Sequence, residues 1–114
     1  MALCSLVVIV ASTALSNRSE PPVRVIVLEA RDLRFDGTNP TLHAKVNERL
    51  RIVVRNFDMG VTHAVSIPAL DTGNITIRAG QTGSIDVTFR QAGEYAYVCS
   101  HHMPSMQGKI IVSD

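Results

Sequence analysis

The sequence predicts an all-β protein: an antiparallel β-sandwich with Greek-key connections and seven or eight strands. Three observations support this fold class. The 114 residues are enough for one domain with a single hydrophobic core. Short runs rich in β-branched residues alternate with turn residues. Apart from the apolar N-terminal run, no stretch carries the 3.6-residue apolar period that would indicate a helix.

The first half of the domain supplies four expected strands. Residues 23–30 (Val-Arg-Val-Ile-Val-Leu-Glu-Ala) are rich in β-branched side chains and predict the first strand. Residues 35–40 contain Asp-Gly and Asn-Pro, which predict a loop. Residues 41–46 alternate weakly and predict a second strand. Residues 50–57 predict a stronger one, and residues 62–68 follow as the fourth.

The second half supplies four more strands. Residues 74–78 alternate polar and apolar side chains (Asn-Ile-Thr-Ile-Arg), and residues 84–90 alternate again. An Ala-Gly-Gln triplet follows the first of these strands and a Gln-Ala-Gly triplet follows the second, so both predict turns. Residues 94–99 lead into a loop rich in sulfur and imidazole groups, and residues 109–112 close the domain.

The N-terminal segment is interpreted separately from the domain. Residues 2–15 carry no charge and are mostly apolar. The run is shorter than a transmembrane helix requires, but its length suits the hydrophobic core of a signal peptide. We therefore interpret residues 1–22 as a signal peptide or N-terminal anchor plus a linker, and residues 23–114 as the domain. A first β-strand of a cytosolic protein is one alternative, and a truncated signal or anchor is another. We therefore expect the protein outside the cytoplasm, in the periplasm or at the outer face of the membrane. The N-terminus could be cleaved on export or could anchor the protein to the membrane.

Composition argues against several classes of partner. The net charge is +1, and the basic residues are spread along the chain, which does not favour nucleic-acid binding. Aromatic residues make up 4% and Trp is absent, so stacking platforms for bases or sugars are not expected. The two cysteines, Cys4 and Cys99, do not form a disulfide framework, because Cys4 lies in the N-terminal run.

The stretch from Cys99 to Met106 contains the side chains that indicate a metal. It holds one thiol, the two imidazoles of His101 and His102, and two thioethers, one of them from Met103. Such soft ligands select copper over magnesium, calcium or manganese. Two His, one Cys and a weak axial Met compose a mononuclear electron-transfer copper site. The stretch supplies Cys, one His and Met, so this hypothesis requires a second His from elsewhere.

His63 is available as the second imidazole. It lies at the start of an expected strand, after a loop, and about 36 positions before Cys99. Loops far apart in sequence cluster at one end of a β-sandwich. A ligand at a strand start and further ligands in a late loop can therefore meet at one end of the domain.

With His63 added, the sequence resembles the cupredoxins, the small type 1 blue copper proteins such as plastocyanin, amicyanin and azurin. The matching features are an Asn-x-Asp loop before His63, a Gly-x-Tyr-x-Tyr-x-Cys run at residues 93–99, and Met-x-Gly-x-Ile-x-Val at residues 106–112. Cys-x2-His and His-x3-Met spacings lie between these two runs. The resemblance covers about residues 23–114.

The resemblance implies which side chains bind the metal. His63, Cys99 and His102 would form a trigonal set around one type 1 copper ion, with Met106 as the long axial ligand. The Cys-x2-His spacing is that of plastocyanin-like and amicyanin-like proteins, whereas His-x3-Met is nearer to the azurin-like loop. The binuclear copper centre of cytochrome oxidase subunit II needs a second Cys in this loop, which the chain lacks.

Alternatives at the ligand positions remain open. His101 could replace His102, and Met106 could fill the core without contacting the metal. Met103 and His101 are otherwise expected at the surface. Cys99 as an inert core thiol is the plain alternative to a ligand.

The residues around the ligands have simpler expected roles. Backbone N–H groups of the loop after His102 and of residues 56–62 are the expected hydrogen-bond donors around the ligands. Ala64 stands where plastocyanin-like proteins often carry an Asn that braces the ligand loops, so the resemblance does not identify the bond to the Cys99 sulfur. His43 is expected to be a solvent-exposed strand residue, and Asp58 is expected to form a turn. Tyr95 and Tyr97 are expected to pack in the core and at its edge.

The predicted function is electron transfer by a copper ion that cycles between Cu(I) and Cu(II). The alternative is an extracytoplasmic copper carrier or resistance protein that does not shuttle electrons. With one predicted site and no second metal cluster, an enzyme is not expected. We expect a monomer that docks transiently to redox partners near His102, through a patch formed by Met59, Gly60, Met103 and Pro104.

Overall fold

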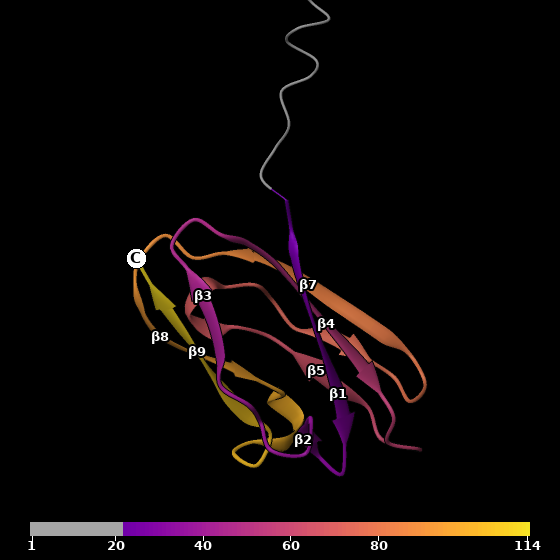
Figure 1. Ribbon diagram of the computed structural model, residues 1–114. Helices are drawn as coiled ribbons and strands as arrows, with labels where there is room; N and C mark the ends of the chain where they lie inside the picture. The colour runs from indigo at the N-terminus through magenta and orange to yellow at the C-terminus, as the bar shows by residue number, and fades with distance from the viewer. Residues whose placement is uncertain (1–21) are drawn as a thin grey trace, which may run out of the picture.

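The computed structural model of the protein describes residues 22–114 (Figure 1). The N-terminal interpretation, with Cys4 and nearly all of residues 1–22, therefore lies outside the described residues. Within residues 22–114, no helix is long and apolar enough to cross a membrane.

Two main sheets face each other and confirm the predicted β-sandwich. The first sheet has the order β2-β1-β4-β7, the second β3-β9-β8, and β5 pairs with β6 in a small third sheet. The strands are β1 (Arg24–Arg31), β2 (Arg34–Phe35), β3 (Leu42–Lys45), β4 (Arg49–Asn56), β5 (His63–Val65), β6 (Ile75–Ile77), β7 (Thr82–Thr88), β8 (Gly93–Val98) and β9 (Gln107–Ser113). Two short 3-10 turns, η1 (Pro68–Leu70) and η2 (Ser100–His102), complete the described elements.

The strand pairing differs from the prediction in two respects. The sheets are mixed rather than antiparallel, because β1 pairs with β4 in parallel and β3 pairs with β9 in parallel. After β1 the chain crosses to the other sheet through β3 and returns, so β4 enters beside β1 in the same direction. The described residues also include a ninth strand, β2, where a loop was predicted. It exists because a two-residue turn folds it back onto the end of β1.

The core is built from side chains that alternate along the strands. In β4 the buried side chains are Leu50, Ile52 and Val54, and Asn56 continues the same face. In β9 the buried positions include Ile110 and Val112. Each such apolar side chain stabilises the fold by about 1.5–3 kcal/mol when fully buried. The alternation therefore determines which face of each strand points into the sandwich.

One end of the sandwich gathers the loops that matter for function. We call this end the ligand pole; it comprises residues 32–33, 57–62 and 99–106. In Figure 1, β2 and the loop containing η2 lie at the lower end, opposite the start of β1. A bridge between Ser66 and Val98 holds the strand after His63 against the end of β8, with N···O distances of 3.0 and 2.9 Å. This bridge brings residues 63 and 99 together.

Candidate metal centre

Three predicted ligands converge at the ligand pole. His63 begins β5, Cys99 follows β8, and His102 ends η2, and their ligand atoms all lie within 4.8 Å of one another. The Cys99 Sγ is 3.9 Å from Nδ1 of His63 and 3.4 Å from Nδ1 of His102. Both imidazoles therefore direct Nδ1 toward the sulfur.

Backbone hydrogen bonds close the loop that carries the remaining ligands. The N–H of Cys99 donates to the carbonyl oxygen of Met106 (3.0 Å), and the N–H of Met106 donates to the carbonyl of His102 (2.9 Å). The N–H of His102 donates to the carbonyl of Cys99 (3.1 Å), which forms the η2 turn. Met106 and Cys99 are both completely buried. Met106 is thus placed inside the pole beside Cys99, and its role as axial ligand stays a prediction.

The hydrogen bond to the sulfur comes from a backbone position that was not predicted from the sequence. The N–H of Ala64 donates to Cys99 Sγ at 3.3 Å. The sequence predicted donors around the ligands in the loop after His102 and in residues 56–62, but the bond to the sulfur comes from β5. Ala64 lies in β5, directly after His63, where its backbone runs alongside Cys99. Because the donor is a backbone group, the bond does not depend on the side chain at residue 64.

Asn56 is the side chain that braces the His63 loop. It is buried, its Nδ2 donates to the carbonyls of Val61 (2.7 Å) and Ile77 (3.0 Å), and its Oδ1 accepts the N–H of Asp58 (2.9 Å). This role was not predicted from the sequence. A signal was present, because the alternation of β4 places this polar side chain on the core-facing side, where a buried amide must find partners.

Replacing Asn56 by alanine is expected to lower the free energy of unfolding by about 1–3 kcal/mol, because partner groups lose their hydrogen bonds inside the protein. Urea unfolding of the copper-free protein measures the loss. Asn74→Ala is the matched control, since Asn74 is exposed and makes one side-chain bond, to Ser100 Oγ. It should change stability by less than about 0.5 kcal/mol. Equal losses in the two variants would contradict the bracing role.

Asp58 does more than form a turn. Its carboxylate accepts a hydrogen bond from His63 Nε2 at 2.7 Å and from the backbone N–H groups of Asp32 (2.6 Å) and Leu33 (3.1 Å). Burial by itself would raise the pKa of Asp58. The bonds from Leu33, His63 and Asp32 outweigh burial and hold the pKa below its ordinary value, so the carboxylate is ionised.

The two imidazoles differ in their access to solvent. His63 is completely buried, whereas His102 is partly exposed. Burial lowers the pKa of His102, and the imidazoles of His63 and His101 lower it further. A lowered pKa keeps His102 neutral, which is the form that binds a metal.

A further side-chain contact braces the loop of Met106. Asn39 Nδ2 donates to the carbonyl of Ser105 at 2.7 Å, and its Oδ1 accepts the N–H of Phe35 at 2.9 Å. Ser105 Oγ donates in turn to the carbonyl of His102. The β2–β3 connection therefore fixes the residue before Met106.

The remaining assignments agree with the structure. His101 is exposed, with its ring centroid 6.3 Å from that of His102, and Met103 is 52% exposed. His43 is exposed in β3. Tyr97 is buried in the core, and the partly buried Tyr95 packs against the core cluster.

The donor set fits a copper ion by its own chemistry. One buried thiol with a backbone N–H on its sulfur faces two imidazole Nδ1 atoms, and a thioether lies in the same loop. These are soft ligands in the composition of a type 1 centre. The fold and the site thus define a β-sandwich protein with a site for one type 1 copper ion.

Comparison with known families agrees with this class. The family model of the cupredoxin-like domain matches residues 2–112. The chain belongs to the cupredoxin family. The match begins upstream of residue 23, and the division at that residue stays a prediction.

Solved structures with the same fold include several copper proteins. Auracyanin A, a blue copper protein of the green thermophilic photosynthetic bacterium Chloroflexus aurantiacus, is 21% identical with a TM-score of 0.67, over 80% of this chain and 99% of that one. The reduced form of an amicyanin variant is 24% identical with a TM-score of 0.54, and the match covers 85% of this chain and 87% of the amicyanin chain. A copper-containing nitrite reductase of Thermus scotoductus SA-01 is 24% identical with a TM-score of 0.67, over 81% of this chain but 28% of the reductase. At these identities the likeness concerns the fold. No curated protein sequence matches the chain.

Proposed function

We propose that the protein is a one-electron carrier with His63, Cys99, His102 and Met106 as ligands of a single type 1 copper. The observation that carries the proposal is the convergence of one thiol and two imidazole Nδ1 atoms within 4.8 Å, with one imidazole partly exposed. A bound copper ion would supply a Cu(I)/Cu(II) couple. No catalytic role is proposed for the chain.

The surrounding fold holds the donors in one arrangement. His63 begins β5 and Cys99 follows β8, and the Ser66–Val98 bridge joins these two segments. The side chains of Asn56 and Asn39 brace the two ligand loops. Such rigidity lets one ligand arrangement serve two oxidation states with little rearrangement. The Ala64 N–H stabilises negative charge on Cys99 Sγ.

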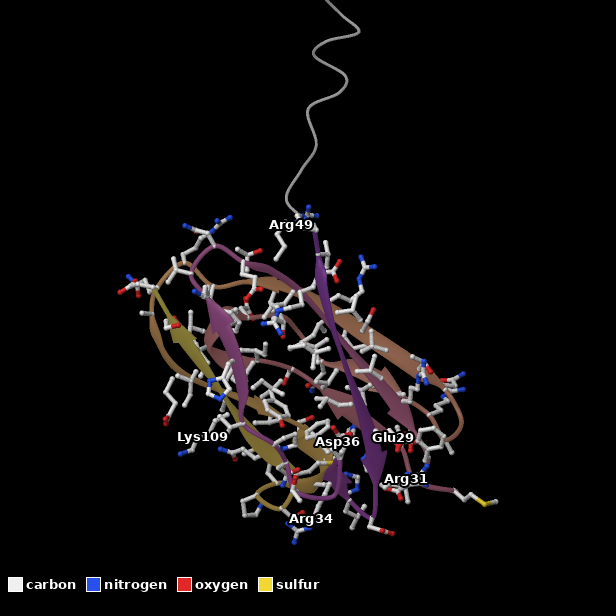
Figure 2. All side chains as sticks on the ribbon, viewed as in Figure 1. Glu29, Arg31, Arg34, Asp36, Arg49 and Lys109 are labelled. Carbon is white, nitrogen blue, oxygen red and sulfur yellow. The ribbon has the colours of Figure 1, made fainter. Side chains whose placement is uncertain are left out.

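Partner docking is proposed at the ligand pole, over the exposed edge of His102. Met59 is 93% exposed and Met103 52% exposed, and with Gly60 and Pro104 they provide the apolar patch. Charged residues near the pole have mixed sign, as the labelled Glu29, Arg31, Arg34 and Asp36 illustrate (Figure 2). Long-range steering is therefore weak, and contacts should be small and transient, between a monomer and its redox partner.

The second candidate function is copper carriage without electron shuttling. It is favoured by soft side chains at the surface, namely His101, Met59 and Met103, which suit transient Cu(I) binding. For either function we propose an extracytoplasmic location, with residues 1–22 as signal peptide or anchor.

Addition of Cu(II) to the purified protein distinguishes the two functions. An electron carrier should develop an intense visible thiolate-to-copper band and cycle reversibly between the two oxidation states. A colourless protein that binds only Cu(I), or no copper, would rule out the electron carrier, and the Cu(I)-only result would favour the copper carrier.

Replacing Met106 by leucine is expected to keep the visible band and raise the reduction potential, because loss of an axial thioether disfavours Cu(II). The shift should be on the order of 60 mV, which corresponds to a tenfold change in the relative affinity for the two oxidation states. Protein-film voltammetry measures it, and Met103→Leu is the matched control. An unchanged potential would show that Met106 only fills the core.

A further inference from the structure

The Asp58 carboxylate connects the buried ligand His63 to the hairpin of β1 and β2. Its side chain is 13% exposed, and the His63 side chain that bonds to it is not exposed at all. A charge in such a position is screened by salt and water much less than a surface charge. Its influence on the neighbouring centre should therefore be large for a group that is not itself a ligand.

The hairpin is shaped to hold that charge. Arg31 and Arg34 pair across a two-residue turn, in which Asp32 has φ = 50° and Leu33 has φ = 60°. Both values lie in the left-handed region, which is unfavourable for leucine. The conformation nevertheless directs both backbone N–H groups to the Asp58 carboxylate. The strain is local and coincides with the binding of this carboxylate, as is common near functional sites.

The bond to His63 determines which ring nitrogen carries the proton. An ionised carboxylate only accepts hydrogen bonds, so the 2.7 Å contact requires a proton on His63 Nε2. Nδ1, the atom that faces Cys99 Sγ, is then the ring nitrogen left to bind a metal. The chain thus presets His63 for metal binding.

We propose that Asp58 is a positioning residue that sets the oxidation-state preference of the copper site. The carboxylate holds His63 in the Nε2–H tautomer, and its negative charge, added to that of the Cys99 thiolate, favours Cu(II) over Cu(I). It thereby lowers the reduction potential. This inference rests on the proposed function and assigns the residue that tunes it.

The test compares Asp58→Asn with Asp36→Asn. Asp36 is the matched control, because it also belongs to the hairpin region and its carboxylate accepts a backbone N–H, from Glu29 at 2.6 Å, but it contacts no ligand. In Asp58→Asn we expect Cu(II) affinity to fall about 10- to 100-fold and Cu(I) affinity to change much less. Each tenfold difference raises the potential by about 59 mV. Asp36→Asn should leave both affinities and the potential unchanged.

A second measurement does not need the variant to fold. In the copper-free wild-type protein, ¹⁵N chemical shifts of His63 should show a proton on Nε2. An Nε2 without a proton, or a potential that is the same in Asp58→Asn and Asp36→Asn, would overturn the proposal.

A different result would show that the proposed electron-carrier function is wrong. In that case the wild-type protein forms no thiolate-to-copper band with Cu(II), while the His63 tautomer still reports whether Asp58 positions the ring.

Discussion

Replacing Cys99 by serine is expected to abolish the intense visible band of the copper-loaded protein. The band requires a thiolate bound to Cu(II), and a serine hydroxyl is a hard donor that stays protonated at neutral pH. The structure leaves no substitute thiol within residues 22–114, because Cys99 is the one free cysteine of the described residues. Absorption spectroscopy during Cu(II) titration measures the result, and the band should fall below detection.

The control for this experiment is His101→Ala. His101 is exposed and lies next to the site in sequence, but its ring is not part of the converging set of donors. This variant should retain nearly all of the band. Loss of the band in His101→Ala would show that His101, and not His102, binds the metal. A band that persists in Cys99→Ser would contradict thiolate ligation.

Replacing Gly108 by alanine is expected to cause a large loss of stability. Gly108 in β9 lies opposite Tyr97 in β8, and a Cβ atom at residue 108 would lie 2.3 Å from both Cζ and Oη of Tyr97. The tyrosine cannot yield easily, because it is completely buried, packs against Phe35 with ring centroids 5.1 Å apart, and donates its hydroxyl to the Pro40 carbonyl. Overpacking of this kind costs about 1–3 kcal/mol and sometimes more.

Thermal unfolding of the copper-free protein measures this effect. For a domain of this size, each kcal/mol of lost stability lowers Tm by about 4–8 °C. Lys109→Ala, one residue along the same strand, is the control and should change Tm little, because Lys109 is exposed. A smaller side chain at residue 97, as in Tyr97→Leu, should cost less in the Gly108→Ala background than in the wild type. Additive effects would show that the clash with Tyr97 is not the cause.

The Gly108 contact also explains part of the sequence pattern. The run of residues 106–112 has the glycine of a Met-x-Gly pattern, and the run of residues 93–99 has tyrosine at its fifth position. In the structure these two residues are cross-strand partners, and the ring of Tyr97 covers the backbone of Gly108. The two motifs that resemble the family are therefore two halves of one packing contact.

Much of the fold could be predicted because strand formation depends on local alternation. The run that became β7 alternates buried and exposed side chains as expected, and β4 and β9 show the same alternation in the structure. The pairing could not be predicted in the same way. The parallel contacts of β1 with β4 and of β3 with β9 depend on how the chain crosses between sheets, and β2 exists only because it pairs with the end of β1.

For the metal centre, the sequence by itself determined the chemistry of the donors. Cys99, His102 and Met106 belong to one short loop, so their spacing is visible in the chain, and His63 follows from its place at the start of an expected strand. Only the tertiary structure decided which atoms meet. It directs Nδ1 of both imidazoles to the sulfur and places Asp58 on Nε2 of His63. It also selects the N–H of Ala64 as the bond to Cys99, across 35 residues. The physical reason is that residue types and spacings are local properties, whereas hydrogen-bond partners depend on the register and packing of strands that are distant in sequence.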